Sequence, residues 1–205
     1  MLRLLIIRHG QTSYNLEGRN QGHADIELDE TGLEQAESCS VALQQESVDA
    51  VYSSDMKRTV ATAEALSQKI GVQKRSDHRL RERDYGSWEG MTRDEILERD
   101  GEAYLAYKRD PVLQLSGGGE NGIDVFARVG YFLVELLERH ASGTVAIFTH
   151  GGSGSALIAA LLHGSPATAD CFRLSNCGIT EITFDEIGTR RMVRFDDCSH
   201  FRTSC

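Results

Sequence analysis

The chain has 205 residues, of which 40% are hydrophobic and 26% are charged, and its formal net charge is -9. This length and composition fit one globular domain covering 1–205 with a core of its own. The negative charge argues against a nucleic-acid-binding protein, although a few arginines inside a cleft could still attract a small anion.

Targeting and metal-binding patterns are missing from the sequence. The N-terminal apolar run covers only residues 4–7, which is too short for a signal peptide, and no stretch reaches the roughly 20 apolar residues of a membrane span. The five cysteines form no C-x-x-C pair, and the seven histidines form no H-E-x-x-H pattern. We therefore expect a cytoplasmic protein with reduced thiols, no membrane partner and no bound metal.

Strands and helices are predicted to alternate along the chain, from the spacing of apolar residues and from the turn residues between them. In chain order, the predicted elements are a strand over 3–8, a helix over 31–45, a strand over 50–53, helices over 53–70, 92–110 and 122–140, a strand over 144–149, a helix over 151–162, and strands over 179–184 and 192–195. A glycine-rich loop is expected over 116–119.

Capping signals support three of the predicted helix starts. Thr31 with Glu34, and Thr92 with Glu95, have the spacing of a capping box. The run Ser53-Ser54-Asp55 offers caps for the helix that follows the second strand.

This alternation predicts an α/β fold, a three-layer sandwich whose central, mostly parallel sheet is flanked by helices. In such folds the functional site lies at the carboxyl ends of the strands. Three of the predicted strand ends carry notable residues: 8–10, 53–58 and 149–152.

Together these strand ends suggest an anion site suited to phosphate. Arg8, Arg58 and His150 would surround His9, and the nearby glycines (Gly10, Gly151 and Gly152) would let the backbone approach closely. His9 would act as a nucleophile if one ring nitrogen donated to a backbone carbonyl and left the other free. The two arginines would disfavour protonation of His9, because like charges repel.

An acid is also needed to protonate the leaving oxygen when a phosphoryl group is transferred. The run Glu82-Arg83-Asp84 offers two carboxylates, Glu82 and Asp84. Residue chemistry alone does not distinguish them.

The sequence resembles the histidine phosphatase superfamily, the phosphoglycerate-mutase-like group. The resemblance is carried by five blocks that occur in family order across most of the chain: Arg8-His9-Gly10-Gln11-Thr12, 54–63, 80–90, Gly118-Gly119-Glu120-Asn121 and 149–152. It implies a phosphoglycerate-mutase-like fold and no metal or organic cofactor.

The resemblance also implies a role for each site residue. His9 would be the phosphorylated nucleophile, and Arg8, Arg58 and His150 would bind the phosphoryl group with help from Asn15. Glu82 would be the acid, so by analogy it is preferred to Asp84. The remaining candidates for binding phosphate or substrate are Gln21, Gly22 and Gly151.

The expected activity is hydrolysis of a small phosphomonoester, since the run from Glu82 to Gly90 is similar to the phosphatase branch. The alternatives are a phosphoglycerate-mutase-type phosphotransferase and a non-catalytic phosphate sensor. The partner would be a small phosphorylated metabolite, whose leaving group we expect to meet the 21–23 segment, Arg83 and the 86–110 region. A homodimer is one expected assembly.

Overall fold

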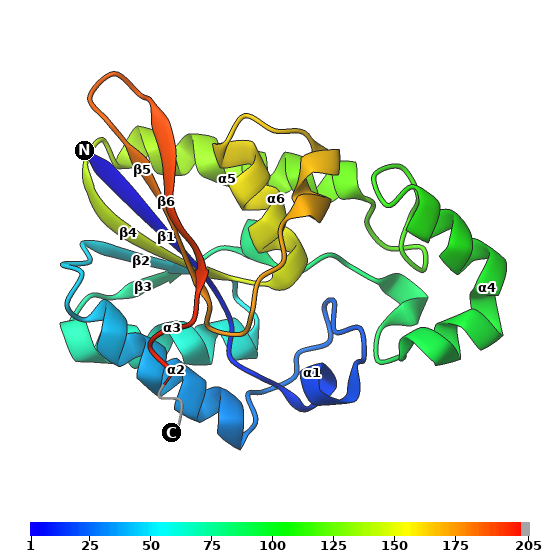
Figure 1. Cartoon of the computed structure of the whole chain (residues 1–205). Helices are drawn as coiled ribbons and strands as arrows, with labels where there is room; N and C mark the ends of the chain where they lie inside the picture. The colour runs from blue at the N-terminus through cyan, green and yellow to red at the C-terminus, as the bar shows by residue number, and fades with distance from the viewer. Residues whose placement is uncertain (202–205) are drawn as a thin grey trace.

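A six-stranded sheet forms the centre of the computed structural model, which describes residues 1–201 (Figure 1). Its strands are β1 (Leu2–Arg8), β2 (Ala50–Ser53), β3 (Lys74–Ser76), β4 (Gly143–Thr149), β5 (Ile179–Phe184) and β6 (Arg190–Asp197). They lie in the order β3-β2-β4-β1-β5-β6. The first four strands in this order, β3, β2, β4 and β1, run parallel to one another. β5 is antiparallel to both of its neighbours, β1 and β6. The predicted mostly parallel sheet is confirmed.

Helices cover both faces of this sheet (Figure 1). They are α1 (Ser13–Glu17), α2 (Glu30–Leu43), α3 (Lys57–Ile70), α4 (Arg93–Arg109), α5 (Gly122–Arg139) and α6 (Gly151–Leu161), together with the 3-10 turns η1 (His78–Leu80), η2 (Gly86–Trp88) and η3 (Pro166–Cys171).

Alternate side chains of β1 enter two separate cores, as the pleat of a strand requires. Leu4 and Ile6 belong to the core that contains residues of α5 and α6. Leu5 and Ile7 belong to the core that contains residues of α2 and α3. The expected three-layer sandwich is therefore confirmed, and its central strands are apolar because both of their faces are buried.

Two predicted helix starts differ in the structure. Asp29, rather than Thr31, is the N-cap of α2, because its carboxylate accepts the Gly32 N–H at 2.8 Å. The next helix begins at Lys57 without a side-chain cap from its own N-cap residue. Its Lys57 N–H donates to Asp25 at 2.8 Å, and the Asp55 carboxylate binds Arg81 instead. At α2 another local residue takes the cap, whereas at α3 contacts with distant residues replace it.

The start of α4 is as expected, since Thr92 caps it in a capping box with Glu95. This helix stands away from the sheet at one side of the molecule (Figure 1). Two short elements, α1 and β3, were not predicted.

No helix within residues 1–201 is long and apolar enough to cross a membrane. Cys39, Cys171, Cys177 and Cys198 are free thiols.

Candidate active site

The carboxyl ends of β1 and β4 meet at one edge of the sheet. Arg8 lies opposite Thr149 in the parallel register, and the His9 N–H donates to the Thr149 carbonyl at 3.0 Å. Arg58 lies in the first turn of α3, directly after the neighbouring strand β2. The topology thus brings together residues that lie about 140 positions apart in the sequence.

The His9 ring is oriented by its own backbone. Its Nδ1 lies 2.7 Å from the Gly10 carbonyl oxygen, so Nδ1 carries the proton and Nε2 keeps its lone pair. Gly10 is held in turn, because its N–H donates to Thr62 at 3.1 Å. A Cβ on Gly10 would lie 2.4 Å from the Gly32 carbonyl oxygen, so this turn requires glycine.

Burial and charge favour neutral His9. The residue is only 2% exposed. Burial, followed by the charges of Arg8 and Arg58, holds the pKa of His9 well below its usual value. The imidazole is therefore in its nucleophilic form at neutral pH.

His150 faces His9 across the site, with ring centroids 5.1 Å apart in an edge-to-face arrangement. Its Nδ1 accepts from Arg58 Nε at 3.2 Å, which leaves the proton on Nε2. That buried Nε2 has no hydrogen-bond partner among residues 1–201. A buried donor without a partner suits an anionic ligand.

Two arginines, Arg58 buried and Arg8 partly buried, supply positive charge. Arg58 is fully buried and donates to the carbonyls of Ala24 and Gly22, each at 2.8 Å. Burial lowers the pKa of Arg58 to about 10, which is still above neutral pH, so Arg58 remains cationic. Burial also lowers the pKa of Arg8. Arg8 donates to the Leu174 carbonyl at 2.7 Å, and its buried Nε has no partner in the described part of the chain.

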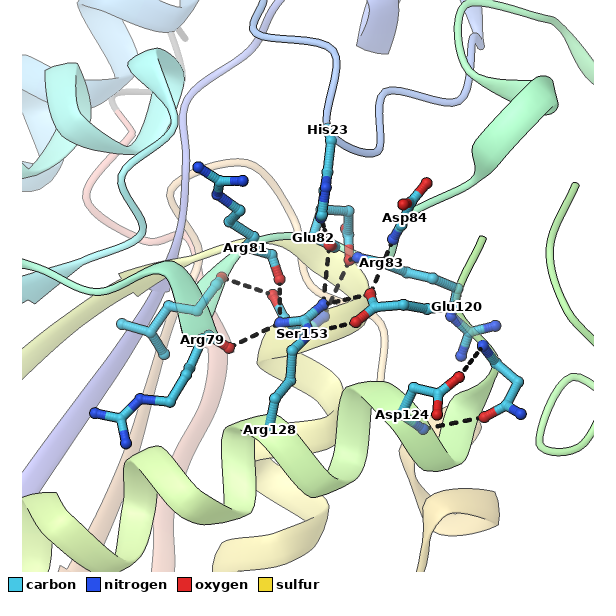
Figure 2. Close-up of polar contacts among 12 residues, drawn as sticks. His23, Arg79, Arg81, Glu82, Arg83, Asp84, Glu120, Asp124, Arg128 and Ser153 are labelled. Carbon is cyan, nitrogen blue, oxygen red and sulfur yellow. Dashed lines mark hydrogen bonds and ion pairs between the residues drawn. The ribbon is translucent and has the colours of Figure 1, made fainter. Parts of the chain in front are cut away.

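Glu82 is held at the N-terminus of α6, where backbone N–H groups are free to bind a carboxylate. Its two carboxylate oxygens accept from the N–H groups of Gly152 at 2.9 Å, Ser153 at 3.1 Å and Arg83 at 2.8 Å. Asp84 turns away from this helix, and its carboxylate accepts the Gly86 N–H at 2.7 Å (Figure 2).

Two adjoining cavities share Arg8, Glu82 and Tyr85. The smaller, of about 140 Å³, is lined by Arg8, His9, Asn15, Arg19, Asn20, Gln21, Arg58, Glu82 and Tyr85. The larger, of about 590 Å³, extends past Glu82 toward α4 and η3. Glu82 lines both cavities, whereas Asp84 lines neither.

The larger cavity is rich in positive charge. Besides Arg8, its lining includes four basic residues: Arg83, Lys108, Arg109 and Arg173. Its acidic lining residues are Glu82 and Asp170. Arg83 donates to the Tyr107 hydroxyl at 2.9 Å and lies over the Tyr107 ring, so its position is fixed.

The remaining predicted residues take different places. Asn15 and Gln21 line the smaller cavity, and Gly151 lines the larger one. Gly22 lines neither cavity and contributes its carbonyl to Arg58. His23 also lies outside both cavities, with its Nε2 3.0 Å from the Glu82 carbonyl oxygen.

Sequence reasoning missed Asn176, whose side chain N–H group donates to the His9 carbonyl at 2.8 Å and to Asn15 at 3.3 Å. It also missed Tyr85, which lines both cavities. Asn176 lies just before β5, and the start of an antiparallel strand lies at the same edge as the end of its neighbour β1. That topology was the only signal, because no motif surrounds Asn176.

Within residues 1–201, no group of three or more His, Cys, Asp or Glu side chains is placed to hold a metal ion.

Comparisons with known proteins agree with this geometry. A phosphoserine phosphatase of Hydrogenobacter thermophilus is 32% identical over 186 residues, covering 91% of this chain and 88% of that protein. A glucosyl-3-phosphoglycerate phosphatase of Mycobacterium tuberculosis is 38% identical over 168 residues, covering 78% of this chain and 75% of that protein. A mycobacterial glucosyl-3-phosphoglycerate phosphatase structure solved with VO3 superposes with a TM-score of 0.86 at 32% identity, covering 95% of this chain and 98% of that one. The family model described as histidine phosphatase superfamily (branch 1) matches residues 4–197, and the chain belongs to that superfamily.

Proposed function

We propose that this chain is a phosphomonoester phosphatase that works through a phosphohistidine on His9. One observation carries the proposal: the Nδ1 of His9 is fixed by the Gly10 carbonyl, in a cavity that also contains Arg8, Arg58 and the Glu82 carboxylate. The family membership of the chain and the phosphatase names of its relatives support hydrolysis as the outcome.

In the first step, the lone pair on His9 Nε2 forms an N–P bond as the P–O bond to the leaving group breaks. The ester oxygen receives that bond's electron pair and takes a proton from the acid form of Glu82. Arg8, Arg58 and the Nε2–H of His150 would bind the equatorial oxygens, where the negative charge is spread. Asn15 would assist them from the wall of the smaller cavity.

In the second step, water attacks phosphorus and the N–P bond breaks, which returns its electron pair to His9. Glu82 takes the proton from the attacking water and regains its acid form. Inorganic phosphate is the product. The leaving group would occupy the larger cavity, whose basic lining favours a group that carries negative charge.

A rapid-quench experiment with a ³²P-labelled ester tests the mechanism. Wild-type protein in EDTA should hydrolyse p-nitrophenyl phosphate and accumulate an acid-labile, base-stable phosphoenzyme. His9→Ala should abolish both signals, whereas His78→Ala should keep them, because His78 is exposed and lines neither cavity. Full activity in His9→Ala would contradict the proposal.

A phosphotransferase is the alternative function. It would transfer the phosphoryl group to a second hydroxyl compound faster than it released inorganic phosphate. Measuring both products from one labelled donor, with and without glycerate as acceptor, distinguishes the two activities.

A further inference from the structure

The guanidinium of Arg128, on α5, lies against the segment that carries Glu82 (Figure 2). Its Nη1 donates to the carbonyls of Arg79 at 2.7 Å and Arg81 at 2.6 Å. Its Nη2 donates to the Glu82 carbonyl at 2.9 Å. One side chain therefore binds three carbonyls within four residues through the planar, five-donor fork of arginine, whereas a lysine ammonium has three donors and no fixed plane.

The Glu120 carboxylate links Arg128 to the backbone on the far side of Arg83, at Asp84 (Figure 2). Its carboxylate binds Arg128 through Nε at 2.7 Å and through Nη2 at 2.9 Å. The same carboxylate accepts the Asp84 N–H at 3.0 Å. The ion pair thus holds the backbone on both sides of Arg83.

The segment needs such support because it lies between η1 and η2, outside any helix or strand. In the described chain, no backbone N–H donates to the carbonyls of Arg81 and Glu82. They are bound by side chains instead, since Arg128 contacts both and the His23 ring lies 3.0 Å from the Glu82 carbonyl. The Glu82 side chain then reaches α6, so its carboxylate depends on where this backbone lies.

We infer that Arg128 and Glu120 are positioning residues for Glu82, an inference that rests on the proposed role of Glu82 as the acid. Neither residue lines the two cavities. They act by fixing the backbone from which Glu82 reaches the leaving oxygen. Arg128 and Glu120 are not ligands of the phosphoryl group, which would be bound by Arg8, Arg58 and His150.

This role has a distinct kinetic signature. An acid contributes most when the leaving group is poor, so Arg128→Lys should lower kcat for an alkyl phosphate such as glycerol 2-phosphate by roughly 10-fold or more. The loss should be smaller for p-nitrophenyl phosphate, which needs little protonation. Inhibition by inorganic phosphate should change by less than about 2-fold, because the phosphate ligands are untouched. Arg139→Lys is the matched control, since Arg139 is on the same helix and, within residues 1–201, pairs only with Glu135.

A double-mutant cycle separates positioning from general support of the fold. In a Glu82→Gln background the acid is already lost, so adding Arg128→Lys should change the alkyl phosphate rate by less than about 2-fold. A full multiplicative loss in that background would overturn the inference. An equal loss for good and poor leaving groups in the single variant would also overturn it.

Glu120→Gln provides a second variant if Arg128→Lys does not fold, as judged by circular dichroism and thermal unfolding. It keeps the shape of the side chain, removes its charge, and should show the same leaving-group selectivity. If the wild type forms no phosphohistidine, the proposed function has failed. If it does form one and both variants lack the selectivity, only the positioning role has failed.

Discussion

The imidazole rings of His9 and His150 lie edge to face, with their centroids 5.1 Å apart, and both are buried next to two arginines. In each ring the Nδ1 atom is hydrogen-bonded, and the Nε2 atom has no hydrogen-bond partner within residues 1–201. The tautomers are opposite: His9 offers a lone pair from Nε2, and His150 offers a proton from Nε2. One histidine can therefore attack phosphorus while the other binds a phosphoryl oxygen.

Protein stability should decrease as pH falls below about 6.5, the usual histidine pKa. Burial and neighbouring charges hold the pKa values of His9 and His150 well below it in the folded state. The unfolded chain therefore binds more protons than the folded chain, and the free energy of unfolding rises with pH in this range. Urea unfolding between pH 7.5 and 5.5 measures the slope. His150→Gln should have a shallower slope, and a wild-type stability that does not change over this range would contradict the prediction.

Gly152→Ala should impair acid catalysis without unfolding the protein. A Cβ at Gly152 would lie 2.5 Å from Glu82 Oε1, so the flexible carboxylate must move. Alanine is favoured over glycine inside a helix by about 1 kcal/mol, so the thermal midpoint should not fall. We expect a roughly 10-fold or larger loss of kcat for glycerol 2-phosphate and a smaller loss for p-nitrophenyl phosphate. Gly130→Ala is the control, because a Cβ there meets no atom within 4 Å; equal activity of both variants would count against the prediction.

Asn176→Ala should slow phosphorylation of His9. The Asn176 amide is hydrogen-bonded to the His9 carbonyl at 2.8 Å and contacts Asn15, so it helps to hold the nucleophile's backbone. Losing one such bond costs about 1 kcal/mol, or roughly a 5-fold change in rate if the bond is fully expressed in the transition state. Rapid-quench measurement of phosphoenzyme formation tests this value. Wild-type kinetics in the variant would show that the contact has no role in the reaction.

Arg83→Met should reduce preference for negatively charged leaving groups. Arg83 lines the larger cavity and lies over the Tyr107 ring, and within residues 1–201 its guanidinium donates to the Tyr107 hydroxyl and the Pro111 carbonyl and to no carboxylate. A hydrogen bond to a charged group contributes about 1.5 kcal/mol or more, so kcat/KM for 3-phosphoglycerate should fall roughly 10-fold relative to glycerol 3-phosphate. The control is Arg93→Met, because Arg93 is exposed and lines neither cavity. An unchanged ratio between the two substrates would exclude this role for Arg83.

Apolar periodicity predicted most of the sheet well. The strands over 50–53 and 179–184 have the same bounds in the structure, and β1 and β4 are each longer than predicted by one residue at their start. β1 and β4 are buried on both faces, so their residues over 4–7 and 145–148 are all apolar. Short elements such as α1 and β3 gave no such signal, because three to five residues cover too few periods to define a face.

The sequence by itself determined the α/β fold and the site's chemical groups, because the residues that follow buried strands must meet at one edge of a parallel sheet. Arg8, His9, Arg58 and His150 follow from that rule alone. Residue chemistry left Glu82 and Asp84 open, and the family resemblance preferred Glu82. The tertiary structure adds the physical difference, because only the Glu82 carboxylate accepts from the N–H groups of Gly152 and Ser153 at the start of α6. It alone brought Asn176 to His9 and Arg128 to the Glu82 segment, because hydrogen bonds between distant parts of the chain follow from packing and leave no periodic pattern.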